Sequence, residues 1–302
     1  MDLSIIIVSF NTKELVADCL NSVKVASTSL PADRQGLKTE IFVVDNNSHD
    51  GTPGFIGKNY PWIHLVRNHQ NVGFAKANNQ ALKKAKGRYI LILNPDTCVM
   101  PDTLTSMIKF MHEHQDTAIA TCRVELANGL LDHDCRRHFP TPWRAFCHFS
   151  GLAKLFKRSK FFDQYYMGYL PDTKDHQIDS CAGAFMMIAK VALDKVGFFD
   201  EDFFFYGEDI DLCFRFKEAG YKIMYTPKTK IIHYKGAASG IKKASKHLSK
   251  ATVESKKRAI AESVRAMELF YKKHYLKKYP FFINFLVIWA VKILGEIRLL
   301  KA

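Results

Sequence analysis

An unbroken apolar run, Tyr89–Leu93, ends abruptly at Asn94, Pro95 and Asp96. Such a run is typical of a strand that is buried on both faces, as in the middle of a parallel sheet. Proline fixes φ and cannot continue a central ladder, so the strand has to stop there. In open α/β sheets, ligands bind at the carboxyl ends of the strands. Asp96 is therefore expected at a ligand-binding edge, unless it caps a helix that begins near Pro101.

Strand-like and helix-like segments alternate along the first 124 residues. Apolar β-branched runs predict the strands, and apolar residues at helical spacing predict the helices. The expected order is strand 3–9, helix 13–24, strand 41–44, strand 63–66, helix 75–86, strand 89–93, helix 101–114 and strand 117–124. This alternation predicts an α/β fold in which a mostly parallel, doubly wound sheet is covered by helices on both faces.

The pattern becomes irregular over residues 125–177, a segment rich in aromatic and basic residues. An insertion of this kind usually carries specificity or forms a lid. Regular structure is expected again in an apolar segment at 180–188, a helix at 210–219, two strands at 221–225 and 230–234, and helices in the remainder.

Most of the net charge lies at the C-terminal end. Residues 241–302 contain 15 Lys/Arg and 4 Asp/Glu, which is +11 of the total of +14. This excess indicates an anionic partner. The apolar run at 281–291 is well short of the ~20 residues that a membrane span needs. We expect basic amphipathic helices at an anionic membrane surface, or else a helix pair packed on the rest of the chain or on a second copy. No recognised nucleic-acid-binding motif accompanies the charge, so nucleic acid is not an expected partner.

The cysteines and the N-terminus indicate the compartment. The seven cysteines are odd in number and form no CxxC pair, and no basic region precedes the first apolar run. These features indicate a reducing compartment and no signal peptide. We therefore expect a cytoplasmic protein.

Asp45 ends a second buried strand, as Asp96 ends its own, and the polar turn 46–51 follows it. A carboxylate in this place can accept hydrogen bonds from a base or a ribose, or it can cap the helix after Gly51. Neither the GxGxxG fingerprint nor a phosphate loop follows the first strand. Their absence argues against dinucleotide dehydrogenases and phosphate-loop NTPases.

Further titratable groups lie in the second half of the chain. Glu208 and Asp209 follow phenylalanines at 203–205. Aromatic surroundings remove water from a carboxylate and raise its pKa toward the range of a general base, although an acidic helix N-terminus explains the pair equally well. His233 ends an apolar strand and is a candidate ligand, with Asp96, for a divalent ion. A purely structural histidine is the commoner case.

The ordered motifs resemble inverting family 2 glycosyltransferases, and among them the bacterial rhamnosyltransferase-like subgroup. They stand at residues 8–11, 44–51, 71–75 with 78 and 79, 93–96, 183–185, 197–201, 206–211 and 233. Asn94-Pro95-Asp96 replaces the common Asp-x-Asp of such enzymes and keeps only its second acid.

The resemblance implies a glycosyltransferase type A fold, which is Rossmann-like, over residues 1–240. A nucleotide-sugar half (1–124) would be joined to an acceptor half (125–240), and 241–302 would be a membrane- or partner-associating tail. The implied activity is inverting transfer of a sugar from a nucleotide-diphosphate sugar, with dTDP-rhamnose favoured. The acceptor would be a glycan or lipid-linked glycan in cell-surface polysaccharide synthesis, at the inner face of the cytoplasmic membrane.

The resemblance also implies a role for each matching residue. Asp209 would be the general base with Glu208 beside it, and Asp96 and His233 would bind Mg²⁺ or Mn²⁺ on the donor diphosphate. Gly183 and Ala184 would line the junction between donor and acceptor. The residues at the nucleotide sugar would be Ser9, Asn11, Asp45, Asn47, Asn71, Gly73, Asn78 and Asn94.

Two arginines in the insertion are candidates for the acceptor side. Arg136 and Arg137 could bind an acceptor phosphate in a bidentate manner, or they could form a solvated basic turn. Two alternatives to a transferase share the nucleotide-binding design: a sugar-1-phosphate nucleotidylyltransferase and a non-catalytic nucleotide-sugar-binding relative. Release of nucleoside diphosphate would mark the transferase, and release of pyrophosphate the nucleotidylyltransferase.

Overall fold

The computed structural model describes residues 1–28, 37–236 and 253–300, so the start of the predicted tail, 241–252, lies outside the described residues. Within the described part, nine strands form one sheet in the order β3-β2-β1-β4-β8-β6-β9-β5, and β7 pairs with β9 beside that path. The strands are β1 Leu3–Ser9, β2 Thr39–Asp45, β3 His64–Arg67, β4 Tyr89–Leu93, β5 Thr97–Val99, β6 Thr117–Leu126, β7 His176–Gln177, β8 Phe185–Ala189 and β9 Lys222–His233.

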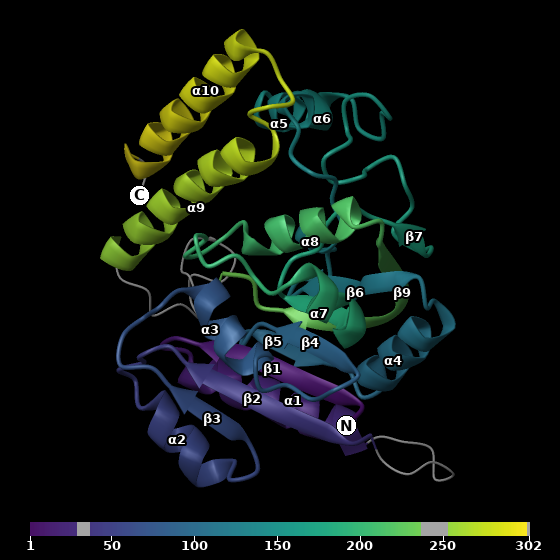
Figure 1. The fold of residues 1–302 in the computed structure, drawn as a ribbon, viewed down its shortest axis with the longest axis vertical. Coiled ribbons are helices and arrows are strands. Elements are labelled where there is room, and N and C mark those ends of the chain that lie inside the picture. The colour runs from purple at the N-terminus through teal and green to yellow at the C-terminus, as the bar shows by residue number, and fades with distance from the viewer. Residues whose placement is uncertain (29–36, 237–252, 301–302) are drawn as a thin grey trace.

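The N-terminal part is the doubly wound unit that the sequence predicts. β3, β2, β1 and β4 run parallel, and every residue of β1 and β4 is buried. Helix α3 (Phe74–Leu82) packs on β1 and β2, while α1 (Lys13–Thr28), α2 (Thr52–Asn59) and α4 (Thr103–Glu113) cover the other face (Figure 1). The carboxyl ends of these strands therefore share one edge.

The rest of the sheet is mixed. β8 runs antiparallel to both β4 and β6, and β5 runs antiparallel to β9. One long strand, β9, replaces the two strands predicted at 221–225 and 230–234. Its pairing with β6 shifts register between Thr226 and Lys230, and this irregularity accommodates Pro227, which has no N–H to donate. The short strand β5 was not predicted, because three residues carry too little pattern.

The helices α5 and α6 of the insertion and the C-terminal helices lie in the upper part of Figure 1. The insertion contains the turn η1 (His133–Cys135) and the helices α5 (Pro142–Phe149) and α6 (Leu152–Leu155). Helix α7 (Lys190–Val196) follows β8, and α8 (Glu208–Glu218) precedes β9.

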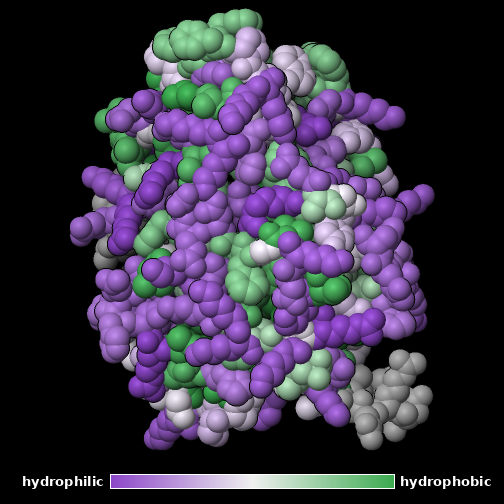
Figure 2. All heavy atoms as spheres, viewed as in Figure 1, coloured by the Kyte–Doolittle hydropathy of each residue, from purple (hydrophilic) through white to green (hydrophobic). Residues whose placement is uncertain are grey.

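The described part of the tail is helical, as predicted, and contains α9 (Val253–His274) and α10 (Phe281–Leu300). Ala266, Phe270 and Tyr271 of α9 belong to the main hydrophobic core. Helix α10 lies on α9 but leaves many apolar side chains in solvent, and Figure 2 shows hydrophobic residues at the top of the molecule, over the position of α10. Among the described helices, none combines the length and apolar character that crossing a bilayer requires.

Candidate active site

Asp45 lies at the shared strand edge with one oxygen free. β1 and β2 pair in a register that sets Ser9 opposite Asp45. The Asp45 side chain is buried, its Oδ2 accepts a hydrogen bond from the Ser48 N–H (3.0 Å), and its Oδ1 has no partner. Helix α2 has Gly51 as its N-cap and no side-chain cap. The interpretation of Asp45 as a helix cap is therefore wrong, and Oδ1 remains available to a ligand's N–H or O–H group.

Asparagine side chains tie the loops around this edge together. Asn46 Nδ2 donates to Asn71 Oδ1 (2.9 Å), and Asn46 Oδ1 accepts from the Val72 N–H (3.0 Å). Asn11, with a φ of 53°, accepts from the His49 N–H through Oδ1 (2.8 Å). The sequence assigned no role to Asn46, although it stands within the motif at 44–51. These bonds fix the loops that follow β1, β2 and β3 relative to one another.

Three more of the predicted residues lie near that loop cluster. Asn78 is buried, donates to the Phe74 carbonyl (2.9 Å), and leaves its own Oδ1 without a partner. Gly73 has a φ of +89°, and a Cβ there would lie 2.6 Å from the Phe204 carbonyl oxygen, so no larger residue fits. Asn47, with a φ of 69°, is half-buried and lies 3.4 Å from His49 between side-chain nitrogens.

Gly183 and Ala184 lie beside the same edge. The Ala184 carbonyl accepts a hydrogen bond from the Asn94 N–H (3.3 Å). A Cβ on Gly183 would lie 3.5 Å from the Phe74 ring. The two residues thus stand between the segment after β4 and the start of α3.

Asp96 and His233 meet because β5 pairs with β9. The register sets Thr97 opposite His233, and the Asp96 Oδ1 to His233 Nε2 distance is 3.3 Å. Both side chains are buried, and Asp96 Oδ1 has no hydrogen-bond partner. Helix α4 begins at Thr103 with Asp102 as its N-cap, so the interpretation of Asp96 as the cap of that helix is wrong.

Behind His233 lies a charged network that the sequence did not predict. His233 Nδ1 is 2.9 Å from Asp132 Oδ2, and the Lys235 ammonium bonds both Asp132 and Asp134. Burial by itself lowers the pKa of His233, but the charges of Asp96 and Asp132 more than offset it and raise that pKa to about 9. The only sequence signal was the triplet Asp-His-Asp at 132–134 inside the irregular insertion.

The Asp96–His233 pair fits a divalent cation in part. Over the described residues, no group of three His, Cys, Asp or Glu side chains is placed to hold a metal ion. Asp96 Oδ1, which makes no hydrogen bond, and the adjacent imidazole, once it has lost its Nε2 proton, would supply two ligands, and diphosphate oxygens and water complete such shells. A cation held there would stabilise the negative charge of a leaving diphosphate.

The two acids of the Glu208–Asp209 pair have different surroundings in the first turn of α8. Asp209 Oδ2 lies 2.7 Å from Arg137 Nη2, so this buried carboxylate is compensated. Glu208 Oε2 has no partner. Burial and the neighbouring Asp209 charge raise the pKa of Glu208 to about 8. Both acids lie at the N-terminus of α8, as the alternative of an acidic helix N-terminus predicted. This position is compatible with a catalytic role.

The two arginines of the insertion point to different partners. Both are buried, so the interpretation as a solvated basic turn is wrong. The Arg136 guanidinium donates to the carbonyls of Leu170 (3.2 Å) and Pro171 (3.3 Å) and lies over the Tyr225 ring. Arg136 therefore braces the insertion, while Arg137 reaches the first turn of α8.

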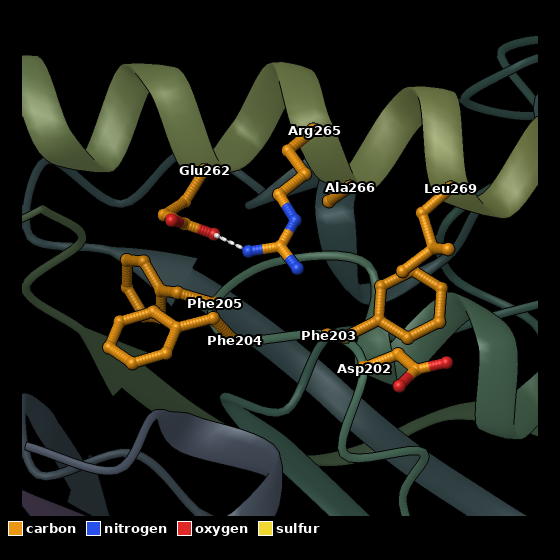
Figure 3. Close-up of a pocket in the computed structure, with 8 residues that line it drawn as sticks. All are labelled: Asp202, Phe203, Phe204, Phe205, Glu262, Arg265, Ala266 and Leu269. Atoms are coloured by element: carbon orange, nitrogen blue, oxygen red, sulfur yellow. Dashed lines mark ion pairs between the residues drawn. The ribbon is translucent and has the colours of Figure 1, made fainter.

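The segment 202–205, which we call the phenylalanine loop, links three parts of the site. The Phe204 carbonyl accepts from the Phe74 N–H (2.7 Å), which joins the loop to the start of α3. From the other side, Arg265, Ala266 and Leu269 of α9 lie over it (Figure 3). Helix α9 thus backs the loop that leads into Glu208 and Asp209.

Comparisons with known proteins identify the family of the chain. The family model described as glycosyl transferase family 2 matches residues 4–197. The chain is 24% identical over 235 residues to the N-acetylglucosaminyl-diphospho-decaprenol L-rhamnosyltransferase of Mycobacterium tuberculosis, covering 74% of each chain. It is 31% identical over 173 residues to rhamnosyltransferase WbbL of Escherichia coli, covering 54% of this chain and 61% of that one.

Solved structures show the same fold. The mannosyltransferase PcManGT from Pyrobaculum calidifontis, in complex with GDP-Man and Mn²⁺, superimposes with a TM-score of 0.53 at 18% identity, covering 99% of this chain and 86% of that one. TarS 1-349 of S. aureus gives a TM-score of 0.52 at 18% identity, covering 91% and 74%. The fold is that of the type A glycosyltransferases. The chain belongs to glycosyl transferase family 2 and is a glycosyltransferase.

Proposed function

We propose that the chain transfers L-rhamnose from dTDP-rhamnose, with inversion, to a glycan or lipid-linked glycan acceptor in cell-surface polysaccharide synthesis. Two relatives are named as rhamnosyltransferases, and one of those names specifies an N-acetylglucosaminyl-diphospho-decaprenol acceptor. The observation that carries the chemistry is Asp209, held by Arg137 and joined to the donor loops through the phenylalanine loop.

The proposed reaction is a single displacement. The acceptor oxygen forms a bond to the anomeric carbon while the bond from that carbon to the diphosphate oxygen breaks. The nucleoside diphosphate leaves with the electron pair, and the proton of the acceptor hydroxyl passes to the Asp209 carboxylate. One displacement inverts the anomeric centre, and no second carboxylate has to act as a nucleophile.

The donor occupies the edge formed by the N-terminal half in this proposal. Asp45 Oδ1 and Asn78 Oδ1, both buried and partnerless, are acceptors for the nucleoside and the sugar. Asp96 and His233 hold the cation at the diphosphate. The remaining donor contacts come from the predicted set Ser9, Asn11, Asn47, Asn71, Gly73 and Asn94.

The acceptor side is formed by the insertion and by the Gly183–Ala184 junction in this proposal. Arg137 belongs to the insertion and pairs with Asp209, which suits it to orient the acceptor near the base. For Arg136, acceptor-phosphate binding stays a prediction that requires its guanidinium to leave the Leu170 and Pro171 carbonyls. The enzyme would work at the inner face of the cytoplasmic membrane, where a lipid-linked acceptor is embedded.

The test is a screen of nucleotide sugars for acceptor-dependent release of nucleoside diphosphate. dTDP-rhamnose should support turnover, and Asp209→Asn should lower kcat by roughly 10²–10⁴-fold, because it removes the proton acceptor and keeps the shape. Donor affinity should change little. Glu208→Gln is the matched control one residue away. If Asp209→Asn is active and Glu208→Gln is inactive, the base is Glu208. If only a nucleotide sugar other than dTDP-rhamnose supports turnover, the rhamnosyl assignment is rejected.

A further inference from the structure

Two segments far apart in the sequence expose apolar side chains beside each other. One is α10, and the other is residues 143–161, which include all of α5 except Pro142 and all of α6. They meet where the Arg298 guanidinium of α10 lies over the Phe149 ring, 5.7 Å from its centroid. Both lie at the end of the molecule farthest from α2 and β3 (Figure 1).

Helix α10 presents an apolar stripe to solvent. The exposed residues of the stripe follow helical spacing and are Phe281, Phe285, Trp289, Ile293, Ile297 and Leu300. The two ends are the most exposed, with Phe281 at 82% and Leu300 at 86%. The opposite side of the helix packs on α9, where Gly295 approaches Val264. The stripe is therefore a face that the described residues of the chain leave uncovered.

The second segment combines exposed apolar residues with positive charge. Its exposed apolar residues are Trp143, Phe146, Phe149, Leu155, Phe156 and Phe161. Lys154, Lys157, Arg158 and Lys160 stand among them, all exposed, and residues 143–161 contain no Asp or Glu. The Trp143 ring lies against the rings of Phe146 and Phe161, so these three aromatic groups form one cluster.

We propose that α10 and residues 143–161 together form a single docking face for an anionic lipid bilayer. Aromatic and aliphatic side chains flanked by lysine and arginine have the chemistry of an interfacial anchor, because the rings enter the headgroup boundary and the cations meet anionic lipids. A second copy of the chain fits less well. In a two-fold symmetric contact, the same face of each copy meets the other, so two surfaces with a net positive charge would be brought together.

The docking face lies a few side chains from the proposed base. Asp209 pairs with Arg137, which lies against Tyr165. The Tyr165 ring is 5.2 Å from that of His148, and Phe149 follows directly. The role of this face, though not its binding to a bilayer, rests on the proposed function. A bilayer on this face would bring a lipid-linked acceptor next to the acceptor side of the site.

The test for binding is sedimentation of the full-length protein with vesicles, without donor or acceptor. Vesicles of equal phosphatidylglycerol and phosphatidylcholine should bind the protein, pure phosphatidylcholine should bind it weakly, and 1 M salt should release it because the Debye length falls to ~3 Å. Changing Lys154, Lys157, Arg158 and Lys160 to Gln should lower partitioning at least tenfold, since each basic group near the surface is worth roughly fivefold.

The matched control changes Lys76, Lys83, Lys84 and Lys86 to Gln. These four lysines are also exposed but lie in and after α3, so the net charge falls equally while binding should stay unchanged. Equal losses for both variants would show a diffuse charge effect and overturn the docking face.

The tryptophans test the orientation. Trp143 and Trp289 belong to the docking face, whereas Trp62 lies between α2 and β3 at the other end. Brominated phosphatidylglycerol should quench the wild type but not a Trp143→Phe/Trp289→Phe variant, which keeps Trp62. Equal quenching of both, or no vesicle binding, would reject the proposal. A third outcome would also reject the proposal: sedimentation velocity shows a dimer, and Trp289→Ser dissociates that dimer without loss of vesicle binding. Because no turnover is measured, failure here is distinct from failure of the proposed transferase activity.

Discussion

At His233, one ring nitrogen faces Asp96 and the other faces Asp132. A carboxylate on the far nitrogen orients a metal-binding imidazole, and losing such a partner typically lowers metal affinity 10–100-fold. Asp132→Asn should therefore weaken Mn²⁺ binding by about that factor in the presence of dTDP. Electron paramagnetic resonance of free Mn²⁺ measures the affinity directly, without any turnover.

The control for this prediction is Asp116→Asn, which removes an exposed carboxylate paired with Lys222 far from the site. It should leave the Mn²⁺ affinity unchanged. If Asp132→Asn also binds Mn²⁺ normally, then Asp132 only balances the charge of Lys235, and His233 needs no orienting partner.

Glu208 predicts a pH dependence of stability. Its pKa in the folded chain is raised to about 8 from the ordinary 4.5, so the unfolded chain loses this proton first. Stability is then lost as pH rises from about 4.5 to about 8, by at most about 1.4 kcal/mol per pH unit. Glu208→Gln should not show this loss, so the difference in unfolding free energy between variant and wild type should grow with pH. Urea unfolding at pH 5, 6, 7 and 8 is the measurement, and parallel curves would show that Glu208 is ionised in the folded chain.

The sequence could predict those site residues whose position follows from the local sequence pattern. Asp45 and Asp96 follow buried strands, and sheet geometry alone places such ends at a ligand-binding edge. Asp132 was not predicted, and for Arg137 the pairing with Asp209 was not predicted, because the partners lie 101 and 72 residues away along the chain. Only the folded insertion brings those partners together, and no local period encodes that.

At the scale of elements, α9 behaves as part of the catalytic body. Phe270 and Tyr271 of α9, and Tyr275 directly after it, are each 5% exposed or less, and Phe270 lies against Phe139 and Phe214. Lys273 bonds Asp200 and Asp202. The composition therefore changes near residue 240, but the hydrophobic core includes side chains from beyond that residue.

This packing predicts the effect of two truncations. Burial of a large side chain contributes roughly 1.5–3 kcal/mol, so losing three removes an amount comparable with a typical total of ~5–15 kcal/mol. A chain ending at Gly240 should be unfolded or lose most of its thermal transition by circular dichroism. A chain ending at Lys278, which keeps α9 and lacks α10, should stay folded. Similar melting of the short chain and the full chain would mean that α9 is dispensable.

The elements themselves were predictable where one strand's sequence sufficed. β1, β2 and β4 fall close to their expected residues, because an apolar run fixes a buried strand locally. β9 and β5 did not, since their extent depends on pairing with β6 and with each other. The antiparallel direction of β8 in the sheet likewise follows from tertiary pairing and cannot be read from the composition of that strand.

For the whole molecule, the proposed arrangement has donor and acceptor arriving from different directions. The donor edge belongs to the N-terminal strands, and the docking face lies beyond α8 and α9 at the other end (Figure 1). A water-soluble nucleotide sugar and a membrane-embedded acceptor suit such a division. The docking face should then matter for one substrate only.

That asymmetry yields a kinetic prediction. Phe285→Ser/Trp289→Ser removes two exposed rings from α10 without touching the site, so the fold and kcat should be retained. The KM for a lipid-linked acceptor in anionic vesicles should rise at least about tenfold, since each 1.4 kcal/mol of lost interfacial binding is a factor of ten. The KM for a short-chain, water-soluble acceptor and for the donor should not move. Val191→Ser, an equally exposed apolar position on α7, is the control and should change none of these constants. If the KM rises equally for both acceptors, α10 acts by supporting the site and does not contact the bilayer.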